Sequence, residues 1–231
     1  MARSRHGGGS SRRGATVKVR AGRGRSTSSV RWLNRQLNDP YVREAQRLGY
    51  RSRASFKLIE IDDRFKLLRP GRRVIDLGAA PGGWTQVALA RAGRDRVLAL
   101  DLLEIPEIDG ATILQADFLD EETPERLRAA LGGPADVVLS DLSPATTGHA
   151  GTDHLRIMAM AEAVLDFAET ILAEGGDLLL KVFQGGAERE LLERLRRNFK
   201  TVKHVKPPSS RKESPELYVV AIGFKGHTEA R

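Results

Sequence analysis

Residues 73–84 constrain the fold of this chain more than any other segment. They begin with the apolar run Val74–Leu77, which is typical of a short buried parallel strand. Three glycines follow in one loop before a helical stretch at 84–91: Gly78, Gly82 and Gly83. Glycine lets the backbone approach a ligand closely, and the first turn of a helix has free N–H donors. The segment therefore predicts the strand, glycine loop and helix that form half of a nucleotide-type site.

Acidic residues end or follow three successive predicted strands. Asp76 ends the first strand, Asp101 follows the strand at 97–100, and Asp117 follows the strand at 112–114. The loop reads G-A-A-P-G-G and lacks the G-x-G-x-x-G spacing that seats a pyrophosphate. A carboxylate suits a cation better than a phosphate, and Asp101 lies where an acid takes ribose hydroxyls. We therefore expect S-adenosylmethionine, a cationic nucleoside. The alternative is a tight strand-to-helix turn whose acids cap helices.

The composition excludes several classes of protein and site. With 231 residues, the chain is long enough for one substantial core. It has no cysteine, and its five histidines show no ligand-like spacing, so we expect no disulfide and no metal. It also has no apolar run long enough to span a membrane, and its N-terminal residues lack the apolar segment of a signal peptide. We expect a cytoplasmic monomer with no membrane partner.

The positive charge is concentrated at the N-terminus. Residues 1–31 contain nine Arg and Lys and no acid. The rest of the chain has 29 basic and 30 acidic residues, a net charge of −1, so the whole positive excess lies in this N-terminal segment. We predict a disordered basic arm at 1–29, because Gly, Ser and Arg bury little apolar surface. Such an arm suits RNA phosphates. The arm could equally be a solubilising extension, since a run of charges does not by itself distinguish RNA binding from a solvated surface.

One domain is predicted over residues 30–226, followed by a short tail at 227–231. Its first part, 30–70, has three short helical patterns and a group of arginines that suits RNA: Arg43, Arg47, Arg51 and Arg53. From residue 73, strand and helix patterns alternate, which predicts an α/β fold with a mostly parallel, doubly wound sheet. The predicted strands are 74–77, 97–100, 112–114, 136–140, 177–183, an edge strand at 200–206 and a final strand at 216–224. The predicted helices after residue 73 are 84–91, 123–131, 155–173 and 188–198.

Two lysines lie where an apolar environment is expected. Lys181 interrupts an apolar strand, and a lysine there is rarely buried unless it is paired. Lys57 borders the apolar stripe of the helix at 54–65, where it could turn inward or extend to water. Asp141 ends the strand beside Lys181, and Glu216 begins the last strand. Two lysines and two carboxylates could neutralise each other in one pocket.

Such a cluster could serve attack by a ribose 2′-hydroxyl on a sulfonium methyl group. The hydroxyl is a weak nucleophile, so a base and strict positioning help it. A lysine accepts the proton only when neutral. Burial and a second lysine favour the neutral form, whereas carboxylates favour the charged form, and the sequence leaves this balance open.

The chain resembles the RlmE/FtsJ family of ribosomal RNA 2′-O-methyltransferases over about residues 29–223. The motifs that carry the resemblance are Ser52–Lys57, Asp76–Trp84, Asp101–Leu103, Asp117-Phe118, Leu139–Pro144, Leu180–Gly185, Ser209–Arg211 and Glu216–Ala221. The resemblance implies a Rossmann-like methyltransferase fold with a final antiparallel strand. It further implies a uridine of the A-loop in 23S ribosomal RNA as the substrate, on assembled or nearly assembled large subunits.

The family pattern also implies roles for individual residues. It makes Lys181 the central catalytic residue, assisted by Lys57, Asp141 and Glu216, which we call the tetrad. Glu216 is chosen over Glu213 because Glu-x-Tyr leads directly into the strand. Around S-adenosylmethionine the resemblance places Gly82, Trp84, Asp101, Asp117 and Asp141. We add the rest of the glycine-loop motif to this predicted site: Asp76, Gly78, Pro81 and Gly83.

Two other functions are compatible with these features. The same chemistry could act on transfer RNA or on an RNA cap, because the family has relatives with such targets. Alternatively, the chain could be a non-catalytic RNA-binding factor in ribosome assembly with a vestigial cofactor pocket. A lysine retained inside an apolar strand argues against the second of these functions.

Overall fold

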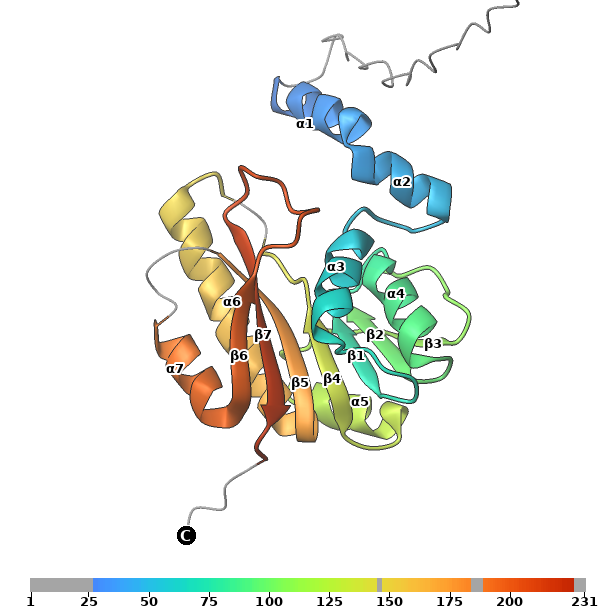
Figure 1. Ribbon diagram of the computed structural model, residues 1–231, viewed down its shortest axis with the longest axis vertical. Helices are drawn as coiled ribbons and strands as arrows, with labels where there is room; N and C mark the ends of the chain where they lie inside the picture. The colour runs from blue at the N-terminus through green and yellow to red at the C-terminus, as the bar shows by residue number, and fades with distance from the viewer. Residues whose placement is uncertain (1–26, 145–146, 184–188, 227–231) are drawn as a thin grey trace, which may run out of the picture.

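The computed structural model describes residues 27–144, 147–183 and 189–226 (Figure 1). The predicted tail at 227–231 and residues 1–26 of the predicted arm lie outside the described residues. One helix, α1 (Thr27–Asn38), begins within the range assigned to the arm.

A single seven-stranded sheet forms the centre of the fold, in the order β3-β2-β1-β4-β5-β7-β6 (Figure 1). The strands are β1 (Val74–Leu77), β2 (Val97–Asp101), β3 (Ala111–Gln115), β4 (Ala135–Ser140), β5 (Leu172–Phe183), β6 (Phe199–Val205) and β7 (Glu216–Phe224). Strands β1 to β5 pair in parallel, whereas β7 lies between β5 and β6 and is antiparallel to both. This confirms the predicted fold class and the edge position of β6.

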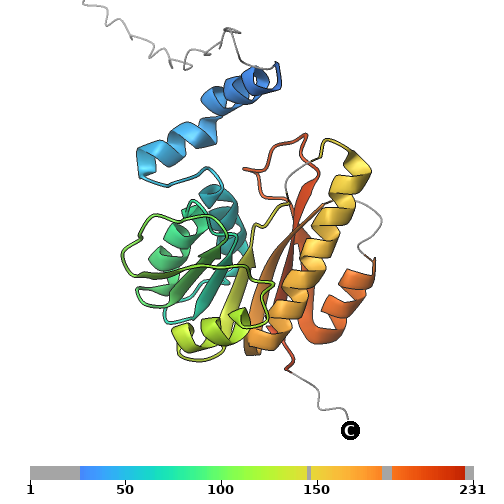
Figure 2. The same ribbon diagram turned by 180° about the vertical axis from the view of Figure 1, so that it is seen from behind.

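Helices cover both faces of the sheet. Besides α1, they are α2 (Pro40–Leu48), α3 (Ser55–Phe65), α4 (Gly83–Ala92), α5 (Thr123–Leu131), α6 (Ala150–Ile171) and α7 (Arg189–Asn198). Helices α3 and α4 pack on one face and α5, α6 and α7 on the other, as the front and back views show (Figures 1 and 2). Helices α1 and α2 extend beyond the sheet at the end where α3 begins (Figure 1).

The short strand β1 is buried on both faces. Val74 packs among α3 and α4, whereas Ile75 and Leu77 face the helices on the opposite side. All four of its residues are buried. A continuous apolar run suits such a strand because parallel sheets are covered on both sides. Asp76 is therefore an exception, a buried acid within an apolar strand.

Helix α2 begins and ends with the predicted local signals. The side chain of Asp39 accepts a hydrogen bond from the Tyr41 amide at 3.0 Å, and Pro40 takes the first helical position. Both features are favoured at helix starts. The helix ends at Gly49, whose φ of 76° is the left-handed conformation that glycine adopts readily.

Two predicted boundaries around α6 were wrong. The helix begins at Ala150, before the predicted start at residue 155, and there Asp153 accepts hydrogen bonds from the backbone N–H groups of Thr147 and Gly148. At its other end, β5 begins directly at Leu172, before the predicted start at residue 177, and the glycines at 175–176 lie inside the strand. The β4–β5 register shifts there, and glycine tolerates such an irregularity.

Candidate active site

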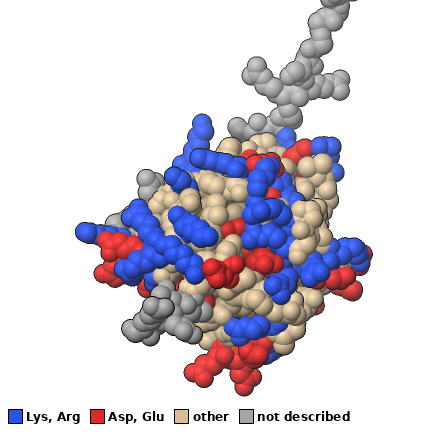
Figure 3. Space-filling view, turned by 60° about the horizontal axis from the view of Figure 1, so that its bottom comes forward, with Lys and Arg blue, Asp and Glu red and all other residues tan. Residues whose placement is uncertain are grey.

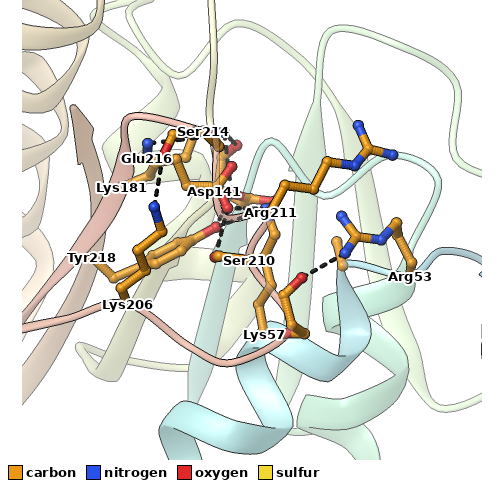
Figure 4. A network of polar contacts seen from close by, with 12 residues as sticks. Arg53, Lys57, Asp141, Lys181, Lys206, Ser210, Arg211, Ser214, Glu216 and Tyr218 are labelled. Carbon is orange, nitrogen blue, oxygen red and sulfur yellow. Dashed lines mark hydrogen bonds and ion pairs between the residues drawn. The ribbon is translucent and has the colours of Figure 1, made fainter. Parts of the chain in front are cut away.

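The four side chains of the tetrad meet at the edge of the sheet formed by the carboxyl ends of the parallel strands (Figure 4). Lys181 Nζ lies 3.1 Å from Asp141 Oδ1, and Lys57 Nζ lies 2.7 Å from Glu216 Oε1. A longer contact of 3.9 Å between Lys57 Nζ and Asp141 Oδ2 joins the two pairs. The residues come from α3, the end of β4, β5 and the start of β7, so four separate elements build one charged cluster.

Strand register brings three of these residues together. In the parallel β4–β5 pair, Ser140 lies opposite Leu180, so the next residues, Asp141 and Lys181, lie side by side. In the antiparallel β5–β7 pair, Phe183 lies opposite Glu216. Side chains alternate between the faces of a strand, so Lys181 and Glu216 occupy nearby positions on one face.

Lys57 reaches this cluster from the third helix. Its side chain is buried, with 7% of the residue exposed, and it turns inward beside the apolar residues Leu58 and Ile61. Its ammonium therefore forms a buried ion pair with Glu216 and does not extend to water. Glu213, the other acid considered at the sequence level, lines the neighbouring cavity.

Tyr218 lies at the centre of the tetrad and was missed at the sequence level. Its hydroxyl donates to Asp141 Oδ1 at 2.6 Å and accepts from Lys57 Nζ at 3.1 Å. The residue is fully buried and lies opposite Lys181 in the β5–β7 ladder. Its position two residues after Glu216, on the same strand face, was the available signal. An aromatic residue in an apolar strand is usually interpreted as core.

The cluster holds its central carboxylate in the charged form. Burial alone would raise the pKa of Asp141, but the ammonium groups of Lys181 and Lys57 and the hydrogen bond from Tyr218 lower it below its usual value. Burial raises the pKa of Tyr218 well above its ordinary value, and the nearby Asp141 and Glu216 charges raise it further. At neutral pH the tyrosine hydroxyl is therefore a hydrogen-bond donor to a carboxylate.

The glycine loop, residues 78–83, lies beside the tetrad between β1 and α4. Gly78 has a φ of 73°, and a Cβ atom added there would lie 2.6 Å from Leu142 Cδ2. Only glycine fits both the conformation and the space. The loop residues Pro81 and Gly83 line a small cavity of about 30 Å³ together with Asp141.

A second cavity, of about 120 Å³, lies on the other side of Gly78. Asp101 and Asp117 line it, with Phe118 and Leu142 among its apolar walls. Each acid also accepts a hydrogen bond from a backbone amide: Asp101 Oδ2 from Ala80 in the glycine loop and Asp117 Oδ1 from Leu119. The structure thus places these two predicted cofactor residues at one cavity, beside the loop.

Two other predicted cofactor residues lie deeper. The Asp76 carboxylate is buried and accepts a hydrogen bond from Thr85 Oγ1 at 2.7 Å. Burial raises its pKa to about 7, in spite of that hydrogen bond. Trp84 is also buried, and its Nε1 donates to the Ala54 carbonyl. The centroid of its ring lies 5.8 Å from that of the Tyr218 ring, and the residue borders the small cavity. Asp76 thus connects β1 with the first turn of α4, and Trp84 connects that turn with the residue before α3.

A third, larger cavity opens next to the tetrad. It has a volume of about 380 Å³, and its lining residues are Arg53, Lys57, Arg211, Glu213, Ser214 and Glu216. Arg53 is held in place there by an ion pair with Asp39 at 2.9 Å. Ser210 connects the loop before β7 to the site by donating to Glu216 Oε1. The cavity combines positive charge with direct access to the Lys57–Glu216 pair of the tetrad.

Basic side chains are not distributed as one uniform surface. On the face shown in Figure 3, lysines and arginines form several groups with acids between them. Of the arginines predicted to form a positive surface, Arg47 pairs with Glu44, whereas Arg51 donates to backbone carbonyls. Within the described ranges, no three His, Asp or Glu side chains form a group suited to a metal ion. None of the helices described is long and apolar enough to cross a bilayer.

Comparison with known proteins identifies the family. The model of the FtsJ-like methyltransferases matches residues 50–224. A ribosomal RNA large subunit methyltransferase E from Gluconobacter oxydans is 62% identical over 213 residues, which cover 92% of this chain and 79% of that protein. A protein of the same name from Paramagnetospirillum magneticum is 57% identical, over 94% of this chain and 91% of its own length.

A solved structure agrees with this assignment. A protein from Plasmodium falciparum, described as a ribosomal RNA methyltransferase, superposes with a TM-score of 0.69 at 26% identity, over 77% of this chain and all of that one. The sequence match includes every residue of the tetrad and the whole glycine loop. The chain therefore belongs to the FtsJ-like methyltransferase family.

Proposed function

We propose that this protein transfers a methyl group from S-adenosylmethionine to the 2′-hydroxyl of a uridine ribose in the A-loop of 23S ribosomal RNA. The observation that carries the proposal is the convergence of Lys57, Asp141, Lys181 and Glu216 beside the glycine loop. The names of the relatives support ribosomal RNA of the large subunit as the acceptor.

The residues around the glycine loop fit S-adenosylmethionine. Asp101 and Asp117 offer carboxylates for ribose hydroxyls and base edges at an apolar cavity, whose wall includes Phe118. Gly78 borders this cavity and also the small one that Asp141 lines. S-adenosylmethionine bound across both cavities would extend from Asp101 and Asp117 to the tetrad. When bound, this cofactor supplies an electrophilic methyl group on a positively charged sulfur.

Lys181 is proposed to act on the ribose hydroxyl. In its neutral form, Lys181 Nζ accepts the hydroxyl proton while the oxygen forms its bond to the methyl carbon and the carbon–sulfur bond breaks. The carboxylate of Asp141, 3.1 Å away, then stabilises the ammonium ion that results. The 2.8 Å hydrogen bond from Lys181 Nζ to the Asp141 carbonyl fixes the direction of the amine.

Lys57 and Glu216 are proposed to position the substrate and to balance charge. They lie between Asp141 and the 380 Å³ cavity, where the target nucleotide would enter. Arg53 and Arg211 at the same cavity suit the phosphates on either side of that nucleotide. The site thereby holds the reacting atoms in line, which accounts for much of the rate gain in such transfers.

Methyl transfer to defined acceptors tests the proposal. Purified large subunits, free ribosomal RNA and transfer RNA are incubated with labelled S-adenosylmethionine, and the 2′-O-methyl position is mapped. We expect labelling of one uridine in the A-loop, strongest on large subunits. Preferred labelling of transfer RNA would contradict the substrate, and absence of any labelling would favour a non-catalytic assembly factor.

A further inference from the structure

Arg51 joins two loops at the predicted cofactor site, although it lies in the connection between α2 and α3. Its Nη1 donates to the carbonyl of Pro106 at 2.6 Å and to that of Pro81 at 3.2 Å. Its Nη2 donates to the Glu107 carbonyl at 2.7 Å. Pro81 belongs to the glycine loop, whereas the other two residues belong to the loop that connects β2 with β3. One guanidinium therefore fastens these two loops to each other.

The glycine loop is shaped around this contact. Gly82 has a φ of 104°, and a Cβ atom added there would lie 3.1 Å from Arg51 Nη1 and 2.5 Å from Ile108 Cδ1. Below it, Ala79 and Ile105 pack in a small buried apolar cluster, against which Ile108 packs. The two loops thus meet at an apolar contact that Arg51 covers from outside.

The backbone of Arg51 is fixed as well. Its amide donates to Gln86 Oε1 at 2.8 Å, and Gln86 Nε2 donates to the Gly49 carbonyl at 2.9 Å. Gln86 lies on α4, directly after the glycine loop. The end of α2 is therefore held on α4 by one side chain, and the guanidinium is held over the loop.

We propose that Arg51 is a positioning residue for the methyl donor, which acts by holding the glycine loop and the loop at 102–110 in their binding arrangement. A guanidinium has five N–H donors, and backbone carbonyls take three hydrogen bonds from this one. On the opposite side of the loop, Asp101 Oδ2 holds the Ala80 amide at 2.9 Å. The loop is thus fixed from both sides. The identity of the donor rests on the proposed function.

The consequence is a specific loss of cofactor affinity. Without the hydrogen bonds from Arg51, the two loops move apart in part of the population, and binding must order them again. We expect Arg51→Gln to raise the Kd for S-adenosylmethionine about tenfold or more. The kcat at saturating cofactor should stay within about threefold of the wild-type value, because Arg51 contacts no tetrad residue in any of the hydrogen bonds described. The KM for the cofactor should rise with the Kd.

Calorimetric titration of the full chain with S-adenosylmethionine, without RNA, tests this inference. The variants are Arg51→Gln, Arg51→Lys and a matched control, Arg47→Gln, whose exposed side chain pairs with Glu44. A lysine cannot span carbonyls of two loops with a planar fork, so Arg51→Lys should weaken binding to an intermediate degree. The control should bind like the wild type. If Arg51→Gln does not fold, Arg51→Lys carries the test.

A second measurement separates this role from contact with RNA. RNA affinity is measured against salt for the wild type and the two Arg51 variants. Unchanged cofactor affinity in the Arg51 variants would overturn the inference, and a reduced salt slope would then assign Arg51 to the RNA. A wild-type protein that does not bind S-adenosylmethionine would instead contradict the proposed function. The two proposals therefore fail in distinguishable ways.

Discussion

The two halves of the proposed active site are built in different ways. Around the glycine loop, the contacts are mainly between side chains and backbone: Asp101 holds the Ala80 amide, and Arg51 holds carbonyls of two loops. In the tetrad, side chains hold one another, since Lys57 pairs with Glu216 and Lys181 pairs with Asp141. The first half depends on the path of the chain, and the second depends on buried charges.

This difference teaches which properties each half controls. As proposed, the glycine loop binds the methyl donor, so the backbone contacts that fix its shape should mainly set cofactor affinity. The tetrad, as proposed, takes part in proton transfer, so its paired charges should affect turnover and also stability, since a buried charge without its partner is costly. Substitutions in the two halves should therefore separate cofactor affinity, turnover and stability.

Lys181→Ala should change the activity more than any other substitution considered, through loss of turnover. Removal of the group proposed to accept the hydroxyl proton should lower kcat about 10³- to 10⁴-fold. Cofactor affinity, measured by calorimetry, should stay within about threefold of the wild-type value. Lys203→Ala removes an exposed lysine from β6, which is separated from β5 by β7, and is the control. A variant that retains near-native turnover would show that Lys181 is not the central group.

The next effect concerns stability in the tetrad. Lys57→Met leaves the Glu216 carboxylate, whose side chain is only 14% exposed, without its cation, which should lower the free energy of unfolding by about 3–5 kcal/mol. The double variant Lys57→Met, Glu216→Gln should recover most of that stability but not the activity. Urea denaturation measures the stability of both variants. If Lys57→Met is as stable as the wild type, the pair is not the buried unit described above.

On the cofactor side, Asp76 should make stability depend on pH. Burial raises its pKa from 3.8 to about 7 in the folded protein. The folded state thus holds a proton that the unfolded chain has released, so the stabilisation is full below about pH 4 and declines until about pH 7. Asp76→Asn keeps the acceptor for Thr85 but cannot titrate. Relative to this variant, the wild type should lose up to about 4 kcal/mol across this range.

Urea denaturation at a series of pH values checks that prediction. The stability of the wild type relative to Asp76→Asn should fall as the pH rises. Asp120→Asn removes an exposed acid nearby and should follow the wild type throughout. Parallel curves for the wild type and Asp76→Asn would mean that Asp76 is ionised throughout this range.

The smallest effect should come from the basic arm, which belongs to neither half. Removal of residues 1–26 takes away eight Arg and Lys. We expect RNA affinity to depend less on salt, by about 0.7–0.9 in the logarithmic slope for each phosphate that the arm neutralises in the intact protein. The unfolding temperature and the cofactor affinity should not change. An unchanged slope would leave the arm as a solubilising extension.

Much of this arrangement could be predicted from the sequence, for identifiable reasons. Parallel strands are continuous apolar runs, so Asp76 and Lys181 stood out as exceptions within them. The sheet then had to bring Asp141 beside Lys181, because neighbouring parallel strands end at one edge. The position of the Lys57 side chain was harder to predict, since a lysine beside an apolar stripe can turn inward or extend to water. Only its packing against β7 decides between these two orientations.

The residues that were missed contact the site in ways that sequence does not reveal. Tyr218 looks like an ordinary core aromatic, and only the β5–β7 register places it opposite Lys181. Arg51 looked like part of a basic surface, yet its hydrogen bonds go to carbonyls in distant segments of the chain, at residues 81, 106 and 107. The glycines at 175–176 favour a helix end as much as an irregular strand, so the start of β5 could not be predicted.

The position of β7 has a consequence for biosynthesis. Of the described strands this one is synthesised last, yet it is inserted between β5 and β6 and supplies both Glu216 and Tyr218. A nascent polypeptide that ends before Glu216 has the lysines of the site but lacks two of their partners. The tetrad therefore stays incomplete until β7 has been synthesised, and a translation product truncated before Glu216 should lack the proposed activity.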